Sequence, residues 1–124
     1  MSKAVLERVT KKEGRSIVHV AAELGHDLML YFFGEMGLDI DAVDSKGDSP
    51  LHLAVENKKQ SSLRFLLSMN AELNVKNKQG RTPLHVAVAS QNVDAIKELL
   101  VKGANRNSVD NEQNKPADLN NKVN

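Results

Sequence analysis

Residues 47–59, "GDSPLHLAVENKK", and residues 80–92, "GRTPLHVAVASQN", decide the fold of this chain. A third version, "GRSIVHVAAELGH", begins at residue 14. The starting positions 14, 47 and 80 are separated by two steps of 33 residues, and no insertion interrupts the register. Self-similarity at a fixed period of about 20–50 residues is the signature of a stacked repeat protein.

Each unit is predicted to contain two short helices. Residues that favour N-caps open the first helix, and two of them are followed by proline, whose missing N–H costs nothing there. A second helix runs through 28–33, 62–68 and 95–101, and it ends at residues that tolerate a left-handed backbone, Gly37, Asn70 and Gly103. The N-caps and the glycines that end the connecting turns are Ser16, Ser49, Thr82, Gly14, Gly47 and Gly80. One unit cannot bury its apolar faces alone, so neighbours must stack.

Composition excludes several classes of protein. The 124 residues carry a net charge of +1, which gives no bulk reason to expect nucleic acid or a membrane as a partner. The absence of cysteine excludes disulfides and thiolate metal sites. The start of the chain lacks the apolar core of a secretory signal, and no apolar run is long enough to cross a bilayer. We therefore expect a monomeric intracellular protein of the cytoplasm, or alternatively the nucleus, with no cofactor.

The repeat resembles that of ankyrin-repeat proteins over roughly residues 11–119. The resemblance is carried by the 33-residue period, by "SPLHLA" and "TPLHVA" at the first helix, and by the leucine pairs 66–67 and 99–100. It implies an all-α repeat solenoid, in which antiparallel helix pairs are joined by hairpin-like turns. Family members bind other proteins on a concave face formed by hairpin tips and first helices, and few are catalytic.

The repeat register predicts three full repeats and two atypical ends. The fourth copy places Lys115, Ala117 and Asp118 where the others have threonine, leucine and histidine, so it is predicted to be a polar half-repeat cap. The expected segments are an N-terminal helical cap or a remnant of an upstream repeat (1–10), three repeats (11–43, 44–76 and 77–109), and the cap with its tail (110–124).

The first repeat carries apolar residues at positions that are polar elsewhere. Leu28 and Tyr31 stand where the second repeat has Ser61 and Arg64, residues typical of a solvated outer face. Either the segment "AVLERV" (4–9) folds back over them, or an upstream repeat or a partner covers them. Both explanations remain open at this point.

Three histidines, His19, His52 and His85, occupy equivalent positions. Equivalent residues of stacked helices lie ~8–10 Å apart. Zinc holds each ligand nitrogen at ~2.1 Å, so these histidines cannot share one ion. The resemblance instead implies that one ring nitrogen bonds the nearby Ser or Thr hydroxyl and the other a backbone group of the next hairpin. His26 is expected to make a capping or hairpin contact, and no catalytic or metal-binding residue is predicted.

The exposed hairpin tips and helix edges are the predicted binding surface. Arg15 and Arg81 are equivalent and could form bidentate bonds to carboxylates, which suggests a weak preference for an acidic protein or peptide surface. The alternative is a solvated charged rim. The candidate residues are Lys12, Glu13, Arg15, Glu23, Leu24, Ser45, Lys46, Asp48, Glu56, Asn57, Lys78, Gln79, Arg81, Ser90, Asn111 and Glu112.

The function predicted from these features is a non-catalytic protein–protein interaction module, a scaffold or adaptor. The alternative is a fragment of a larger protein in which the repeats position a separate catalytic domain. Lysine outnumbers arginine among the 17 basic residues, which is typical of an AT-rich genome. This suggests, as part of the alternative, a bacterial effector that acts in the host cytoplasm.

Overall fold

The structure is a computed structural model that describes residues 12–122. The segment 1–10, for which the sequence predicts a cap or a repeat remnant, lies outside the described residues. Three helix pairs follow one another, and a short 3₁₀-helix flanks them at each side. The elements are η1 (Lys12–Gly14), α2 (Ile17–Leu24), α3 (Asp27–Glu35), α4 (Pro50–Glu56), α5 (Gln60–Ser68), α6 (Pro83–Ala89), α7 (Val93–Val101) and η2 (Pro116–Lys122).

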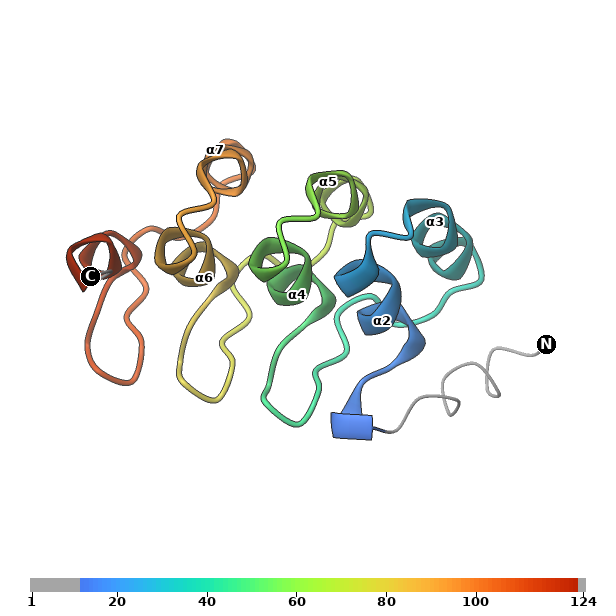
Figure 1. Ribbon diagram of the computed structural model, residues 1–124, viewed down its shortest axis with the longest axis horizontal. Helices are drawn as coiled ribbons and strands as arrows, with labels where there is room; N and C mark the ends of the chain where they lie inside the picture. The colour runs from blue at the N-terminus through green and yellow to red at the C-terminus, as the bar shows by residue number, and fades with distance from the viewer. Residues whose placement is uncertain (1–11, 123–124) are drawn as a thin grey trace.

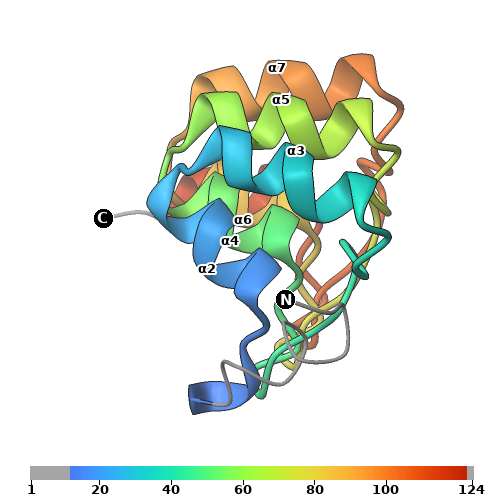
Figure 2. The ribbon, with the colours of Figure 1, turned by 90° about the vertical axis from the view of Figure 1, so that its right-hand side faces the viewer.

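The helices form two parallel rows. The first helices α2, α4 and α6 make one row with η2 at its end, and α3, α5 and α7 make the outer row (Figure 1). The connecting loops project from the first row as a series of fingers. In the view turned by 90°, α3, α5 and α7 run parallel to one another at successive levels, with α2, α4 and α6 below them, which shows that each unit repeats the geometry of its neighbour (Figure 2). The predicted all-α repeat solenoid is confirmed, and none of the helices in the described part of the chain is long and apolar enough to span a membrane.

The first helices start at the predicted N-caps. The side-chain oxygens of Ser16, Ser49 and Thr82 each accept a hydrogen bond from the backbone N–H three residues later. The residue at that third position is a histidine, and its ring accepts from the N-cap N–H in return. This arrangement is a capping box in which histidine replaces the usual glutamate or glutamine.

Small and medium side chains fill the core. Ala22, Ala54 and Ala87 are fully buried in the row of first helices, where their size lets the helices approach closely. Leucines fill the space between the two rows, among them Leu30 and Leu63, which are also fully buried. Since each unit shares these contacts with its neighbour, the described repeats have one continuous core.

The fingers are joined by backbone hydrogen bonds. The N–H of Ser45 donates to the Glu13 carbonyl at 2.9 Å, and the N–H of Lys78 donates to the Lys46 carbonyl at 3.0 Å. Gly47 sits at this contact with φ 76°, and a Cβ there would lie 2.9 Å from the Lys78 nitrogen. Glycine is therefore required at this position both for its backbone angle and for the close approach of the next finger.

The connections that follow the second helices are also hydrogen-bonded from each repeat to the next. The Asp41 carboxylate accepts from the N–H of Glu72, and the Asn74 side chain accepts from the N–H of Asn105, both at 2.9 Å. These contacts explain why Asp41 and Asn74, which accept hydrogen bonds through their side chains, stand 33 residues apart in the sequence.

The C-terminal end is closed by η2 against α6. Pro116 and Leu119 are buried there, whereas Asp118 and Asn120 are exposed. The Asp118 carboxylate accepts from the N–H of Lys115 at 2.9 Å, so it takes over the capping role that histidine has in the other units. The last element therefore presents an apolar side to repeat 3 and a polar side to solvent.

Candidate protein-binding groove

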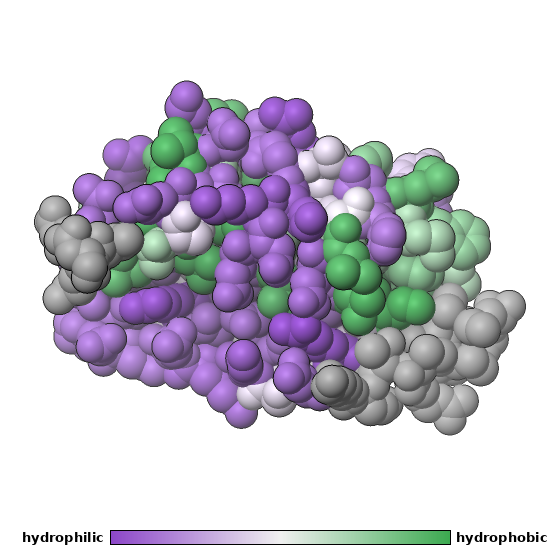
Figure 3. All heavy atoms as spheres, viewed as in Figure 1, coloured by the Kyte–Doolittle hydropathy of each residue, from purple (hydrophilic) through white to green (hydrophobic). Residues whose placement is uncertain are grey.

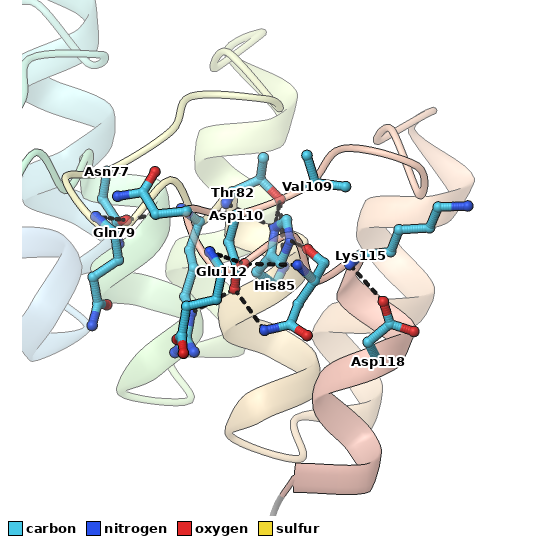
Figure 4. Close-up of polar contacts among 12 residues, drawn as sticks. Asn77, Gln79, Thr82, His85, Val109, Asp110, Glu112, Lys115 and Asp118 are labelled. Atoms are coloured by element: carbon cyan, nitrogen blue, oxygen red, sulfur yellow. Dashed lines mark hydrogen bonds and ion pairs between the residues drawn. The ribbon is translucent and has the colours of Figure 1, made fainter.

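Each equivalent histidine bonds its own helix start and the finger of the next repeat. His85 Nδ1 accepts from the Thr82 N–H at 3.1 Å, and Nε2 lies 2.8 Å from the Asn114 carbonyl (Figure 4). A carbonyl only accepts, so Nε2 carries the proton and Nδ1 is the unprotonated nitrogen of a neutral ring. His52 and His19 make the same contacts, with the carbonyls of Arg81 at 2.9 Å and Asp48 at 2.8 Å. All three rings are fully buried.

Burial favours the neutral form of the His19 and His52 rings. It lowers the pKa of His19 and of His52 below the ordinary value of 6.5. The carbonyl at Nε2 and nearby carboxylates, such as Asp44 and Asp48, act in the opposite direction and offset only part of this effect. The imidazoles are thus held as structural hydrogen-bonding groups in a protonation state that the fold determines.

His26 differs from the expectation for it. It occupies the N-cap position of α3 and is exposed, but its side chain makes no capping hydrogen bond. In the described part of the chain, no three His, Asp or Glu side chains are grouped in a way that could hold a metal ion.

Three residues that the sequence did not single out shape the finger tips. The side-chain oxygen of Asp44 accepts from the backbone N–H groups of Lys46 and Asp48, each at 2.9 Å. Asn77 and Asp110, at equivalent positions, accept in the same way from N–H groups two and four residues later. The available signal in the sequence was an Asp or Asn repeated at a spacing of 33, three residues before Gly47, Gly80 and Gln113.

These three residues also pair with the preceding finger. Arg15 Nε lies 3.6 Å from the Asp44 carboxylate, and Arg81 Nε lies 3.4 Å from that of Asp110. Between them, Asn77 Nδ2 donates to the Asp48 carboxylate at 2.9 Å. Asp48, which stands at the position of the two arginines, is therefore paired with the amide of Asn77 and not with a carboxylate.

Two sequence predictions are corrected by this pairing. Asp48 is not an exposed tip residue, because only 8% of its surface is accessible and its carboxylate is bonded within the fold. Arg15 and Arg81 are not free of partners, because each already pairs with a carboxylate of the fold, Arg81 through Nε alone. Arg15 already contacts Glu23 at 2.6 Å and is close to Glu13 and Asp44, and Arg81 is held by Asp110.

The Asp110 carboxylate is ionised by its surroundings. Burial by itself raises the pKa of this group, but the N–H groups of Asn114 and Glu112 and the Arg81 guanidinium favour the charged form. The balance holds the pKa of Asp110 below its ordinary value. The last finger is thereby fixed to repeat 3 by a buried charge (Figure 4).

A groove with a volume of about 610 Å³ runs between the fingers and first helices of repeats 2 and 3. Val86 and Ala89 give it an apolar floor, and Glu56 stands at the last turn of α4. Eight of the predicted binding residues line it, namely Ser45, Lys46, Asp48, Glu56, Lys78, Gln79, Arg81 and Ser90. These eight residues, which the sequence predicted to share one surface, thus lie around one groove in the structure.

The other predicted binding residues lie outside the groove. Lys12 and Glu13 are in η1, while Glu23 is tied to Arg15 and Leu24 ends α2. Asn57 is exposed and donates to the Leu53 carbonyl of its own helix. In the last finger, Asn111 donates to the Lys78 carbonyl at 2.7 Å and Glu112 is exposed.

The groove has an uneven charge. Lys46 and Lys78 are exposed on neighbouring fingers, and neither forms an ion pair with any residue in the described range 12–122. Arg81 and Asp48 are the most enclosed charged residues of the lining, and both are bonded within the fold. The charges that a ligand would meet are therefore two lysines on the finger side and Glu56 on the helix side.

Comparison with known protein families agrees with this architecture. Residues 3–77 match the family described as ankyrin repeats (3 copies), and residues 79–111 match the family described as ankyrin repeat. A search of curated proteins gave no match. The two family matches cover most of the chain, so this protein belongs to the ankyrin-repeat family.

Proposed function

We propose that this protein is a non-catalytic interaction module that binds an extended segment of another protein in the groove between repeats 2 and 3. Ankyrin repeats in general serve as protein-binding modules. The observation that carries the proposal is the groove itself, because eight residues selected from the sequence as binding candidates line one hollow of about 610 Å³. That volume lies within the range of about 300–1,000 Å³ found for ligand sites in proteins.

The lining supports a segment that combines apolar and acidic side chains. Val86 and Ala89 can receive small apolar groups, and Lys46 and Lys78 can receive a carboxylate from either finger. A preference for acidic partners therefore rests on these two lysines and not on Arg15 and Arg81. Glu56 adds a position at which a basic side chain of the partner is favoured.

The groove is formed before any ligand binds. Its fingers are held by backbone hydrogen bonds, by the Asp48–Asn77 bond and by the histidines below them. A preformed surface loses little conformational freedom on binding, so more of the contact energy appears as affinity.

A displayed random-peptide library selected on the immobilised chain would test this proposal. We expect the selected peptides to carry Asp or Glu beside small apolar residues. The double variant Lys46→Glu/Lys78→Glu should weaken their binding by at least roughly tenfold, which corresponds to about 1.4 kcal/mol.

The matched control reverses two exposed lysines of the outer row, Lys97 and Lys102. This double variant has the same change in net charge and should bind the peptides as the unaltered chain does. Equal loss in both variants would reduce the effect to bulk charge, and no loss in either would remove the groove as the binding site. A further variant, Val86→Arg, tests the apolar floor without altering the fingers.

A further inference from the structure

A second surface, on the first repeat, carries five large apolar side chains. Leu28 is 79% exposed, Tyr31 50% and Phe32 53%. The five residues, which we call the repeat-1 apolar face, are Leu24, Leu28, Met29, Tyr31 and Phe32. Apolar atoms gather at this end of the molecule (Figure 3), and the face shares no residue with the groove between repeats 2 and 3. Contiguous exposed apolar patches of this kind mark interaction surfaces.

Part of this face lies where a preceding unit would pack. Ser62, the residue equivalent to Met29, is fully buried and donates to the Asp27 carboxylate of the preceding repeat at 2.8 Å. Ala95 in repeat 3 is also fully buried. Phe65, equivalent to Phe32, meets Tyr31 of the preceding repeat edge to face, with ring centroids 6.5 Å apart. Met29 thus lies at a stacking position that is fully covered in the other two repeats, and Phe32 lies at one that is partly covered there.

The rest of the face is not explained by stacking. Leu28 and Tyr31 correspond to Ser61 and Arg64 of repeat 2, which remain exposed although that repeat has neighbours on both sides. In repeat 3 the corresponding residues, Asp94 and Lys97, are exposed as well. A segment that covers Leu28 and Tyr31 must therefore extend beyond the stacking surface at Met29 and Phe32 and over the solvent-facing side of α3.

Charge identifies a suitable covering segment. Residues 16–45 contain no lysine or arginine. Glu23 and Asp44 in this range are paired with Arg15, and four further acidic residues form no ion pair with any residue of the described range 12–122, namely Asp27, Glu35, Asp39 and Asp41. The segment 1–11 carries Lys3, Arg8 and Lys11 against the single acid Glu7. Opposite charges on the two segments favour their association, most strongly at low ionic strength.

We propose that residues 1–9 of this chain cover the repeat-1 apolar face. Val5, Leu6 and Val9 have the spacing of one side of a helix, with Lys3 and Glu7 on other sides. The segment joins the described chain at Lys12, and eleven residues can span up to about 36 Å at ~3.3 Å each, so the tether permits the contact.

The expected environment of Leu6 distinguishes this arrangement from an upstream repeat remnant. In the 33-residue register Leu6 corresponds to Asp39 and Glu72, which are exposed, so a remnant would leave Leu6 in solvent. On the proposed covering segment, Leu6 instead contacts the apolar face. A segment tethered to its site has an effective concentration of about millimolar, so modest contacts are enough to keep it bound.

Tyr31 provides a specific readout, because the chain has one tyrosine and no tryptophan. Acrylamide quenching of the intrinsic fluorescence of the 124-residue chain reports the accessibility of that ring alone. The variant Leu6→Glu should raise the quenching constant roughly twofold, since an uncovered apolar ring is returned to solvent. The matched control Ala4→Glu introduces the same charge on the opposite side of the segment and should leave the constant unchanged. Far-UV circular dichroism checks that both variants retain their helices.

A second measurement does not depend on fluorescence. In a double-mutant cycle of unfolding free energies, Leu6→Ser should cost less when Leu28→Ser is already present than when it is not, because the two side chains lose the same contact. Additive effects, or equal quenching in Leu6→Glu and the unaltered chain, would overturn the proposal. So would a quenching constant that falls as protein concentration rises, since that result assigns the face to a second copy.

Discussion

The Asn77 side chain donates a hydrogen bond of 2.9 Å to the Asp48 carboxylate, at the place where the fingers on either side pair an arginine with an aspartate. The three contacts join residues 29 positions apart, from one finger to the next. Asp48 replaces the arginine of its neighbours, and Asn77 replaces their aspartate. The exchange keeps two carboxylates from facing each other in an enclosed site.

This relationship predicts the effect of a single change at residue 77. Asn77→Asp should destabilise the protein by about 1–3 kcal/mol, because a buried hydrogen bond is replaced by repulsion between two carboxylates. Adding Asp48→Arg should recover most of that loss, since the double variant recreates the arginine–aspartate pair found in the other fingers. Urea unfolding of the two single variants and of the double variant measures the coupling, and additive losses would contradict the pairing.

The histidine contacts predict a large loss of stability in His52→Ala. The substitution leaves the Ser49 N–H and the Arg81 carbonyl without their partner in a buried site, so we expect a loss of about 2–4 kcal/mol. His26→Ala is the matched control, since His26 is exposed and makes no capping bond, and it should change stability by less than about 0.5 kcal/mol. Thermal and urea unfolding provide the comparison. Similar effects of the two substitutions would argue against a structural role for His52.

The lowered pKa values of His19 and His52 predict loss of stability in mild acid. A histidine whose pKa is lower in the folded state than its ordinary 6.5 binds protons preferentially when the chain is unfolded. The stability it contributes is complete above pH 6.5 and is lost as the pH falls below that value toward the folded-state pKa. Unfolding free energies measured from pH 7.5 downward should therefore decrease through pH 6 and 5.

The same measurement on His52→Ala isolates the histidine contribution from that of the carboxylates. The variant lacks one of the two groups, so its stability should depend less steeply on pH in this range. Asp110 acts at lower pH, because its depressed pKa stabilises the fold above the ordinary value of 3.8 and that contribution disappears as the pH falls further. Parallel pH curves for the two proteins would rule out His52 as a source of the dependence.

The finger contact predicts different consequences for two glycines. Both have positive φ, 76° at Gly47 and 95° at Gly103, so alanine is strained at either site. At Gly47 the new Cβ would also lie 2.9 Å from the Lys78 nitrogen, whereas at Gly103 no atom lies within 4 Å. We expect Gly103→Ala to cost about 1 kcal/mol and Gly47→Ala to cost more than about 2 kcal/mol. Equal losses would show that backbone angle alone determines the requirement.

Local chemistry made much of the fold predictable. Ser49 and Pro50 indicate the start of a helix, because the Ser49 side chain accepts a capping hydrogen bond and Pro50 lacks the N–H that would have no partner there. Asn70, with φ 62°, and Gly103 end helices because they tolerate the left-handed backbone. These signals depend on residues close in sequence, and the 33-residue register then repeats them along the chain.

The binding surface was predictable only as a set of positions. The register indicated that Lys46, Lys78 and Glu56 face one side, and the structure places them around the same groove. It could not indicate that Asp48 and Arg81 are already bonded, because their partners, Asn77 and Asp110, lie in the next finger, 29 residues further along the chain. A side chain's availability depends on such distant contacts, which the type of residue does not reveal.

The sequence by itself determined the period, the starts of the first helices and the side of each unit that faces its neighbours, because capping, backbone angle and apolar spacing are local properties. Tertiary structure alone decided which polar side chains bind one another and which remain exposed to a partner. His85 illustrates the division: its place in the capping box with Thr82 is local, whereas its bond to the Asn114 carbonyl exists only because the next finger packs beneath it.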